Sequence, residues 1–487
     1  MINISEIIKI IRNQLNIEVY DFDVSYYSNN IYNMLQWYKG TGPDDFHTYT
    51  DTNGVEKITR TRAHLNMAKR VCEDHAGLAF NDNLVVNIDD NDVNNYLFGK
   101  EEVNGYLGPD FWTNMSGLYE ITCALGTGAV ELGIEGLKQC NDLIISNRNT
   151  TKIKLLYHNA MNIIPLTWDE NRNIESVAFL HVVKEKDKIS NSTYNKIYIT
   201  IHNLTDHGYD IINKVIINKD SKYKLCDASD DIIDTYNTGS NIPLFRIIKL
   251  PIINNYDLYS PYGLSIYANG LSALESADMA FTTFKQEFDN AGKRIITDYS
   301  LLPTDERGNK IMDTTSLPYM FYTGYNREVQ DYGAKAPFTE FNPEIRVESI
   351  TQGVQTALNL ISSTCGLGEH AYNFSSGVVK TATEVISENS SCYRNIKRNE
   401  SALSKFMYEL FKSIIYYSNK ILGTGLNEEF NCSFMYDTAI VEDKTEDKKF
   451  DLELVKNNVM TIEEFRNKWF NIPRRSEDSS YIDDNKQ

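Results

Sequence analysis

The sequence predicts an α+β protein: a mainly helical first part, then antiparallel strands, then long helices. Residues 1 to about 145 carry apolar side chains at three- and four-residue spacing. Residues 152–257 form short β-branched and aromatic runs separated by Asn, Asp, Lys and Gly. From Ser260 onward the helical period returns. A chain of 487 residues is expected to fold as two to four structural units.

Composition narrows the class of protein. The chain carries 67 acidic and 48 basic residues, a net charge of −19, whereas a protein that grips phosphates by counterion release is basic. No window reaches the roughly 20 continuous apolar residues of a membrane span, and the N-terminus reads as an amphipathic helix, not an export signal. The seven scattered cysteines predict neither a disulfide framework nor a metal site, and indicate a reducing cytoplasm.

The first half divides by its periodicity. Helices are expected around residues 31–38 and 63–72, where apolar side chains recur at helical spacing. The clearest predicted strands are KIKLLYH (152–158), SVAFLHVV (176–183), NKIYITIHNL (195–204) and DIINKVII (210–217).

Two helices then enclose a β-rich insertion. Ser260-Pro261 predicts a helix start, because Ser caps helices and Pro suits the first turn. Its apolar positions run through about seven turns to the region of Gly292. Residues 293–343 combine strand-like runs with Pro and Gly turn signals, and a second helix is predicted over 344–363.

The remaining chain begins with the irregular loop CGLGEHAYNFSSGVVK (365–380). A helix of about 40 residues is expected from Thr381 to Leu422, then a strand, EFNCSFMY (429–436), and a charged helical tail.

No catalytic signature is complete. Gly126 and Gly128 do not make GxGxxG and follow a predicted helix rather than a strand, so a turn or tight packing is favoured. The eight histidines lack HExxH or any metal spacing to cysteine, which favours structural roles. We therefore expect no cofactor, no bound metal and no enzymatic activity.

Two acidic clusters have competing interpretations. Asp90, Asp92 and Asn94 match part of a calcium-binding loop, but Asn95 stands where that loop needs Gly, so a polar turn entering a helix is favoured over a calcium site. A second cluster is read as a solvated turn rather than a general acid/base pair. Its members are Asp227, Asp230, Asp231 and Asp234.

Two runs resemble a known family. SPYGLSIYANGLSALESADMAFTTFKQEFDNAGKRI (260–295) is similar to a helix that leads into a β-rich insertion, and SSGVVKTATEVISENSSCYRNIKRNESAL (375–403) resembles a glycine loop followed by KTATEV and a long polar helix. Weaker similarities are WYKG (37–40), AKRVCEDHAGLAFND (68–82) and the strand exit at 434–444. The family is that of the portal proteins of long-tailed phages infecting Gram-positive bacteria.

The resemblance implies a portal fold, a ring-forming subunit with wing, helical stem, β-rich clip and helical crown. Laid over this chain, 1–258 is the first part of the wing and 380–437 its long helix and strand. The stem helices are 259–292 and 344–364, the clip is 293–343, the tunnel loop is 365–379, and the crown and tail are 438–487.

Candidate site residues follow from these segments. Polar residues off the apolar stripe of the first stem helix suit a DNA channel wall, although an ordinary solvent face fits equally. These are Ser272, Ser276, Thr283 and Asn290. Basic residues at the junction with the clip either steady DNA or pair with acidic groups of neighbouring subunits. These are Lys285, Lys293 and Arg294.

The clip and the tunnel loop supply the other candidates. Clip aromatics suit docking of a partner, the alternative being a small clip core. They are Tyr319, Phe321, Tyr322 and Tyr325. The loop candidates facing DNA are Gly366, Gly368, Ser375, Ser376, Gly377 and Lys380, where Lys380 has Glu384 as a competing partner.

The resemblance also implies partners. A ring, usually a dodecamer, would pass double-stranded DNA without sequence specificity. It would bind the large terminase, the head-tail adaptor, and the major capsid and scaffolding proteins, and no membrane. The expected location is the virion, with assembly in the host cytoplasm. The competing hypotheses are another virion protein, such as an adaptor or baseplate component, and an enzyme.

Overall fold

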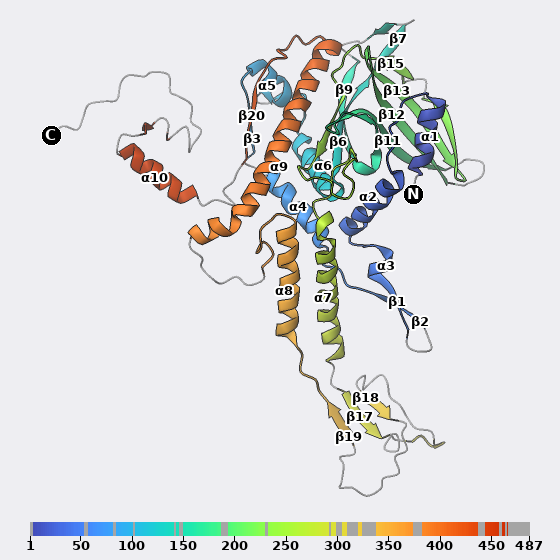
Figure 1. Cartoon of the computed structure of the whole chain (residues 1–487), viewed down its shortest axis with the longest axis vertical. Coiled ribbons are helices and arrows are strands. Elements are labelled where there is room, and N and C mark those ends of the chain that lie inside the picture. The colour runs from blue at the N-terminus through green and yellow to red at the C-terminus, as the bar shows by residue number, and fades with distance from the viewer. Residues whose placement is uncertain are drawn as a thin grey trace, which may run out of the picture.

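Figure 1 shows a computed structural model of the chain. It describes residues 3–52, 57–80, 84–100, 103–140, 143–145, 150–186, 193–228, 232–291, 294–298, 304–308, 320–323, 338–373, 382–436, 444–456, 460–462 and 465. No helix within these ranges combines the length and apolar character needed to cross a bilayer.

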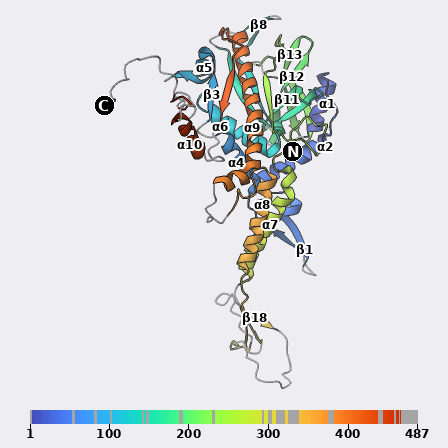
Figure 2. The same ribbon diagram turned by 60° about the vertical axis from the view of Figure 1, so that its left-hand side comes forward.

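The molecule is elongated. A broad body of helices and sheets lies at one end, and two helices, α7 (Leu271–Asn290) and α8 (Val347–Thr364), leave it side by side (Figures 1 and 2). The strands β17 (Arg294–Asp298), β18 (Met320–Thr323) and β19 (Phe338–Phe341) form a small sheet at the far end. In that sheet β17 pairs parallel with β18 and antiparallel with β19.

The largest sheet of the body is antiparallel. Its order is β10-β11-β12-β13-β14, with β15 also pairing with β13. Long β-branched runs build its centre, where Ile197, Ile199 and Ile201 alternate inward along β12. The bounds are β10 (Ile163–Trp168), β11 (Ile174–Lys186), β12 (Thr193–Thr205), β13 (Gly208–Lys219), β14 (Lys222–Asp227) and β15 (Thr235–Asn237).

A second sheet joins this one to the helices. It has the order β16-β6-β9, with β6 (Thr127–Glu135) between β16 (Phe245–Lys249) and β9 (Lys152–Asn159). The first six residues of β6 are buried, because helices and the larger sheet enclose it. Against it pack α6 (Phe111–Leu125) and α9 (Ala382–Tyr417), and α9 continues as a π-helical turn over Ser418–Leu422.

Shorter elements complete the body and its surroundings. The helices are α1 (Ile4–Gln14), α2 (Val24–Lys39), α3 (Asp44–His47), α4 (Met67–Ala79), α5 (Asn91–Phe98) and α10 (Lys444–Lys456). The paired strands are β1 (Thr48–Thr52) with β2 (Lys57–Thr61), β3 (Val85–Ile88) with β20 (Cys432–Met435), β4 (Gly99–Lys100) with β5 (Val103–Asn104), and β7 (Lys138–Cys140) with β8 (Leu143–Ile145).

The predicted α+β class is confirmed, but two boundaries differ. The first 145 residues hold more strand than periodicity indicated, notably β6. Gly126 stops α6 with φ of 83°, a left-handed conformation that suits glycine, and the chain turns directly into a buried strand. The glycine-containing run at 126–128 therefore ends a helix, as the turn interpretation predicted.

The predicted helix start at Ser260-Pro261 is wrong, because α7 begins at Leu271 after a 3₁₀ turn at Ala268–Gly270. The intervening backbone donors are bound elsewhere: Gly263 N–H donates to Thr127 Oγ1 and Ile266 N–H to Cys123 O, both 2.9 Å. Tyr267, completely buried, donates to Met34 O at 2.7 Å. Residues 260–270, called the strap below, therefore connect the start of α7 to α6 and β6.

This strap depends on close backbone contact between Gly126 and Gly263. A Cβ at Gly263 would lie 2.2 Å from the backbone oxygen of Gly126, whereas a Cβ at Gly353 on α8 meets nothing within 4 Å. We expect Gly263→Ala to destabilise the protein by about 1–3 kcal/mol through overpacking. Gly353→Ala should stabilise it by about 0.5–1 kcal/mol through helix propensity. Thermal unfolding checks both; equal midpoints would contradict the role of the strap.

Candidate functional site

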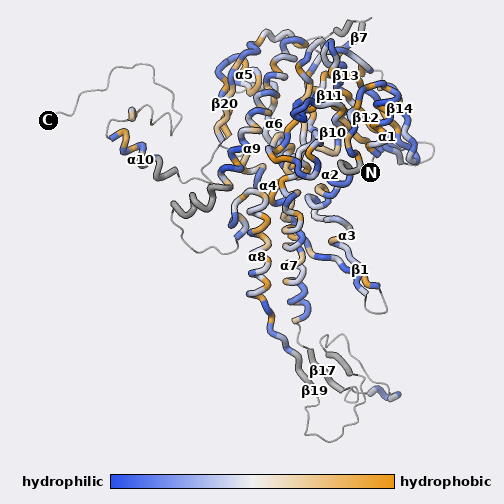
Figure 3. Tube along the Cα trace, viewed as in Figure 1, coloured by the Kyte–Doolittle hydropathy of each residue, from blue (hydrophilic) through white to orange (hydrophobic). Residues whose placement is uncertain are grey.

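The paired helices α7 and α8, called the stem below, pack most closely near the body. The buried side chains include Leu274 and Ala277 on α7 and Val354, Leu358 and Ile361 on α8. Hydrophobic positions recur along both helices (Figure 3). The apolar stripes therefore hold the helices side by side at the body, while some apolar side chains farther along stay exposed.

At the end near the small sheet, a salt bridge joins the two helices. Arg346, just before α8, donates through Nε to Glu287 Oε1 at 3.0 Å and through Nη2 to Oε2 at 2.9 Å. Its backbone N–H also donates to Oε1 at 3.2 Å. These contacts lower the pKa of the Glu287 carboxyl to about 2. A two-point contact of this kind fixes orientation as well as distance.

One face of α7 is exposed and uncharged over the whole helix. The four predicted channel residues Ser272, Ser276, Thr283 and Asn290 are all exposed. Met279 and Gln286 are exposed at the intervening positions, so the six residues form one stripe at three- and four-residue spacing. The hydroxyls of Ser276 and Thr283 donate to the carbonyls four residues earlier, at 2.7 and 3.0 Å. We call these six residues the uncharged stripe.

The predicted basic residues are not on this stripe. Lys285 is exposed on the other side of α7, and Arg294 begins β17. Lys293 lies outside the described residues, as do Tyr319 and Tyr325. Of the predicted aromatic docking set, Phe321 and Tyr322 lie on β18.

Large apolar side chains are also exposed along the stem, away from the uncharged stripe. Phe288 on α7 is 47% exposed, and Leu360 and Val347 on α8 are 53% and 38% exposed. Helix α8 contains one charged residue, Glu348, among its 18. A single stem pair does not bury this surface, which is the property of a helix awaiting a further partner.

The beginning of the predicted tunnel loop is anchored to the body. Gly366 and Gly368 have φ of 81° and 92°, conformations that favour glycine, and Leu367 between them is buried. Tyr372 donates to Asp74 Oδ2 at 2.9 Å, and Cys365 O receives His75 Nε2 at 3.0 Å. Ser375, Ser376, Gly377 and Lys380 lie outside the described residues.

Sequence reasoning missed two buried histidine clusters, whose members come from distant segments. Glu131 on β6 accepts from His158 Nε2 at 2.7 Å and His202 Nε2 at 3.0 Å. Burial by itself raises the pKa of the Glu131 carboxyl, but the two histidines outweigh it and hold the value at about 2. This cluster supports the predicted structural role for histidine.

The second cluster lies where α3 meets the stem. His47 Nε2 lies 2.8 Å from Asp278 Oδ2, and the rings of His47 and His64 are 4.0 Å apart. Burial, and then the neighbouring His47, lower the pKa of His64. Periodicity could not reveal this cluster, because Asp278 is more than 200 residues away from both histidines in the sequence.

The acidic candidates have structural roles. Asp90 accepts from the backbone N–H groups of Asp92 and Val93 and so caps α5, as the turn interpretation predicted. Asp227 and Asp234 both accept from Lys214 Nζ, at 2.7 and 2.9 Å. Asp230 and Asp231 lie outside the described residues.

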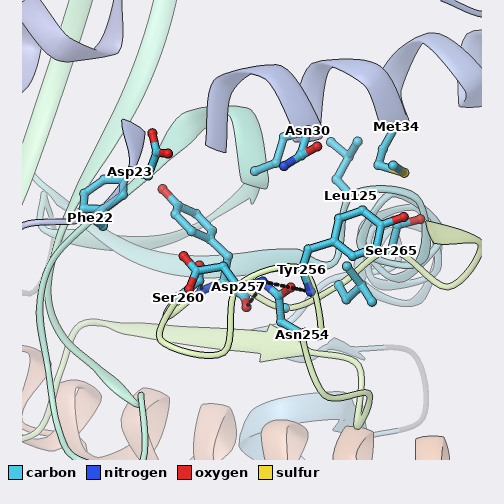
Figure 4. A pocket seen from close by; sticks show the side chains of 14 residues that line it. Phe22, Asp23, Asn30, Met34, Leu125, Asn254, Tyr256, Asp257, Ser260 and Ser265 are labelled. Carbon is cyan, nitrogen blue, oxygen red and sulfur yellow. Dashed lines mark hydrogen bonds between the residues drawn. The ribbon is translucent and has the colours of Figure 1, made fainter. Parts of the chain in front are cut away.

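Figure 4 shows a pocket beside the strap, lined by residues of α2 and of the turn before Ser260. Asn254 Oδ1 accepts from the N–H groups of Tyr256 and Asp257 at 3.1 and 3.2 Å, which shapes this turn. The pocket encloses about 40 Å³, enough for a few water molecules. It is too small to be the functional site.

Comparison with known proteins gives a family. The model described as "Phage portal protein, SPP1 Gp6-like" matches residues 8–487. No curated protein matches the sequence. Among solved structures, a chain from the virion of a native gene transfer agent particle is similar at 11% identity and a TM-score of 0.40, covering 84% of this chain and 90% of that one. A chain from the neck of the native particle, computed with C12 symmetry, has 11% identity, a TM-score of 0.39, and coverage of 82% and 88%.

The Glu287–Arg346 contact makes a prediction for the stem. Since the pKa of Glu287 is depressed, the contact is fully present above about pH 4.5 and is lost as pH falls toward 2. We expect Arg346→Ala to lower the amide protection factors, which compare exchange with the intrinsic rate at the same pH, over residues 284–290 and 346–351 at pH 7. In the parent, lowering the pH toward 2 should lower the same protection factors. Lys285→Ala, an exposed residue on the same helix, is the control. Equal protection in both variants would contradict a stabilising role for the Glu287–Arg346 salt bridge.

Proposed function

This chain belongs to the SPP1 Gp6-like phage portal protein family, and we propose that twelve copies close into a ring through whose axis double-stranded DNA passes. The observation that carries this proposal is the uncharged stripe on α7. It runs the length of a helix that projects from the body, and its side chains are short or uncharged. The portal role itself follows from the family match, which spans nearly the whole chain.

Low friction explains why such a stripe suits DNA passage. Lys or Arg along the wall would release counterions from phosphate and hold the duplex in place. Ser, Thr, Asn and Gln offer only neutral hydrogen bonds. The net charge of −19 per chain adds a repulsive field around the axis, so the duplex is guided without being bound.

Ring closure follows from the exposed apolar side chains. Phe288 and Leu360 lie on different stem helices, both are exposed, and neither belongs to the uncharged stripe. Head-to-tail contacts around a ring would bury such positions against the next subunit. With Phe288 and Leu360 in contact with the next subunit, the uncharged stripe of α7 would face the axis of the ring.

The remaining assignments concern partners. The small sheet β17-β18-β19 would be the clip that meets the large terminase and later the head-tail adaptor, with the predicted aromatic set as its anchor. The body would be the wing, in contact with the major capsid and scaffolding proteins. The tunnel loop, the crown and the Gram-positive host stay predictions from the resemblance, as does assembly in the host cytoplasm before incorporation into the virion.

The channel assignment is tested by adding charge to the stripe. Ser276→Arg together with Thr283→Arg should leave rings intact but slow DNA packaging, because each subunit adds two phosphate contacts. Ser276→Asn with Thr283→Asn, which adds no charge, is the matched control. Packaging rate is measured in an assay with procapsids and terminase, and ring integrity by electron microscopy. A normal packaging rate in intact arginine-bearing rings would remove α7 from the DNA path.

The ring interface is tested with side chains of similar exposure. Phe288→Ser with Leu360→Ser should shift the protein from rings toward monomers, since apolar contact area is lost in every interface. Met279→Ser is the control, because Met279 is 44% exposed but lies on the uncharged stripe. Light scattering gives the mass of each variant. Rings that survive the double substitution, or are lost with Met279→Ser, would place the interface elsewhere.

A further inference from the structure

A segment of the first part of the chain is fastened to the stem. Residues 41–52 and 57–66, which include α3 and the strands β1 and β2, run beside the body end of α7 (Figure 1). Asp278, 5% exposed, receives His47 through Oδ2 and the backbone N–H of Leu65 through Oδ1, at 2.8 and 2.9 Å. The N–H of Ala63 donates to Thr282 Oγ1 at 3.0 Å.

Three metal-binding side chains converge at this contact. His47, His64 and Asp278 each place a ligand atom within 4.8 Å of the other two. Two ligands of one zinc ion, each about 2.1 Å from it at a tetrahedral angle, lie roughly 3.4 Å apart. The three ligand atoms therefore lie close enough for one ion to draw them into a single coordination sphere. It is the sole such group of three found among the described residues.

The surroundings decide which atoms are available. A Cβ at Gly42 would lie 1.5 Å from His47 Nδ1, so the backbone of Gly42 closes that side of the ring and Nε2 faces Asp278. His64 Nδ1 is buried and has no hydrogen-bond partner within the described part of the chain. A buried ring nitrogen without a partner is the kind of unsatisfied polar group that a ligand would satisfy.

Neighbouring groups also hold the ligands in position. Trp37 and Phe46 pack edge-on against His47, with ring centroids 5.1 and 4.7 Å away. The Leu65 N–H orients the carboxylate of Asp278, as outer hydrogen bonds do in metal sites. Arg62, the basic residue nearest to His64 in the sequence, donates a hydrogen bond to the Phe46 carbonyl. Its guanidinium lies over the rings of Phe46 and Tyr49.

We propose that His47, His64 and Asp278 bind one transition-metal dication of the zinc type, which fastens residues 41–66 to the stem. Two imidazoles and one carboxylate are ligands that favour Zn²⁺ or Co²⁺ over Mg²⁺ and Ca²⁺. His47 Nε2 and Asp278 Oδ2 separate by roughly 0.6 Å as two coordinate bonds replace their hydrogen bond. The proton that Nε2 shared with the carboxylate exchanges through water onto Nδ1, so that neutral His47 binds the metal through the Nε2 lone pair. Water completes the tetrahedron. The site is independent of the channel assignment.

Cobalt binding to the chelator-treated, purified full-length protein tests this proposal, because tetrahedral Co²⁺ absorbs visible light. We expect one Co²⁺ per chain at the site, displaced by Zn²⁺ but not by millimolar Mg²⁺. His64→Gln should weaken that binding at least about 100-fold. Since His64 is only half-buried, this variant should still fold, which its unfolding midpoint checks.

His181→Gln is the matched control, since His181 is exposed on β11, outside the cluster, and should leave binding unchanged. Hydrogen exchange gives a second readout: Zn²⁺ should slow exchange over residues 41–66 in the parent and the control but not in His64→Gln. The proposal is overturned if the parent binds no Co²⁺. It is equally overturned if parent and His64→Gln bind Co²⁺ with the same stoichiometry and affinity, because the metal is then elsewhere.

Discussion

The close contact of Gly126 with Gly263 is the constraint on which the rest of the molecule depends. It lets the strap before α7 lie against the end of α6, where backbone donors of the strap bind Thr127 and Cys123. Lys249 adds to this hold by donating to Pro261 O at 3.0 Å, and burial lowers its pKa to about 8. Such an anchored base fixes the direction of α7 relative to the body, because a flexible joint would let the helix swing.

Anchors of different chemistry hold the stem along its length. The strap and the Asp278 cluster hold its base through buried hydrogen bonds, and apolar packing of Leu274 with the α8 stripe holds the region near the body. At the far end, where packing is thinner, Glu287 and Arg346 form an exposed two-point contact. The arrangement leaves one polar face and several large apolar side chains exposed in a single chain. A closed ring offers each of them a use.

The channel proposal rests on the absence of charged side chains from the uncharged stripe. The stripe on α7 lacks charge, although 24% of the whole sequence is charged. Lys285, a charged residue of the same helix, lies on the other side. The polar cluster around Glu131, by contrast, is closed inside the body, where two histidines compensate a carboxylate. Such a cluster orients the strands of both sheets relative to each other and needs no ligand to be satisfied.

Much of the architecture was predictable from local pattern. Apolar spacing located α8 and α9 to within a few residues, and alternation located β11 to β13. Spacing also identified four of the six stripe residues, while Met279 and Gln286 were added by the structure. Periodicity depends only on residues close together in the chain. The sequence by itself therefore determined which segments form helices and strands, and which face of α7 is polar. Only the tertiary structure decided that Ser260-Pro261 starts a strap instead of a helix, and that Asp278 meets His47. The partners that satisfy these groups come from segments more than a hundred residues away, and hydrogen bonds to them outweigh local preference.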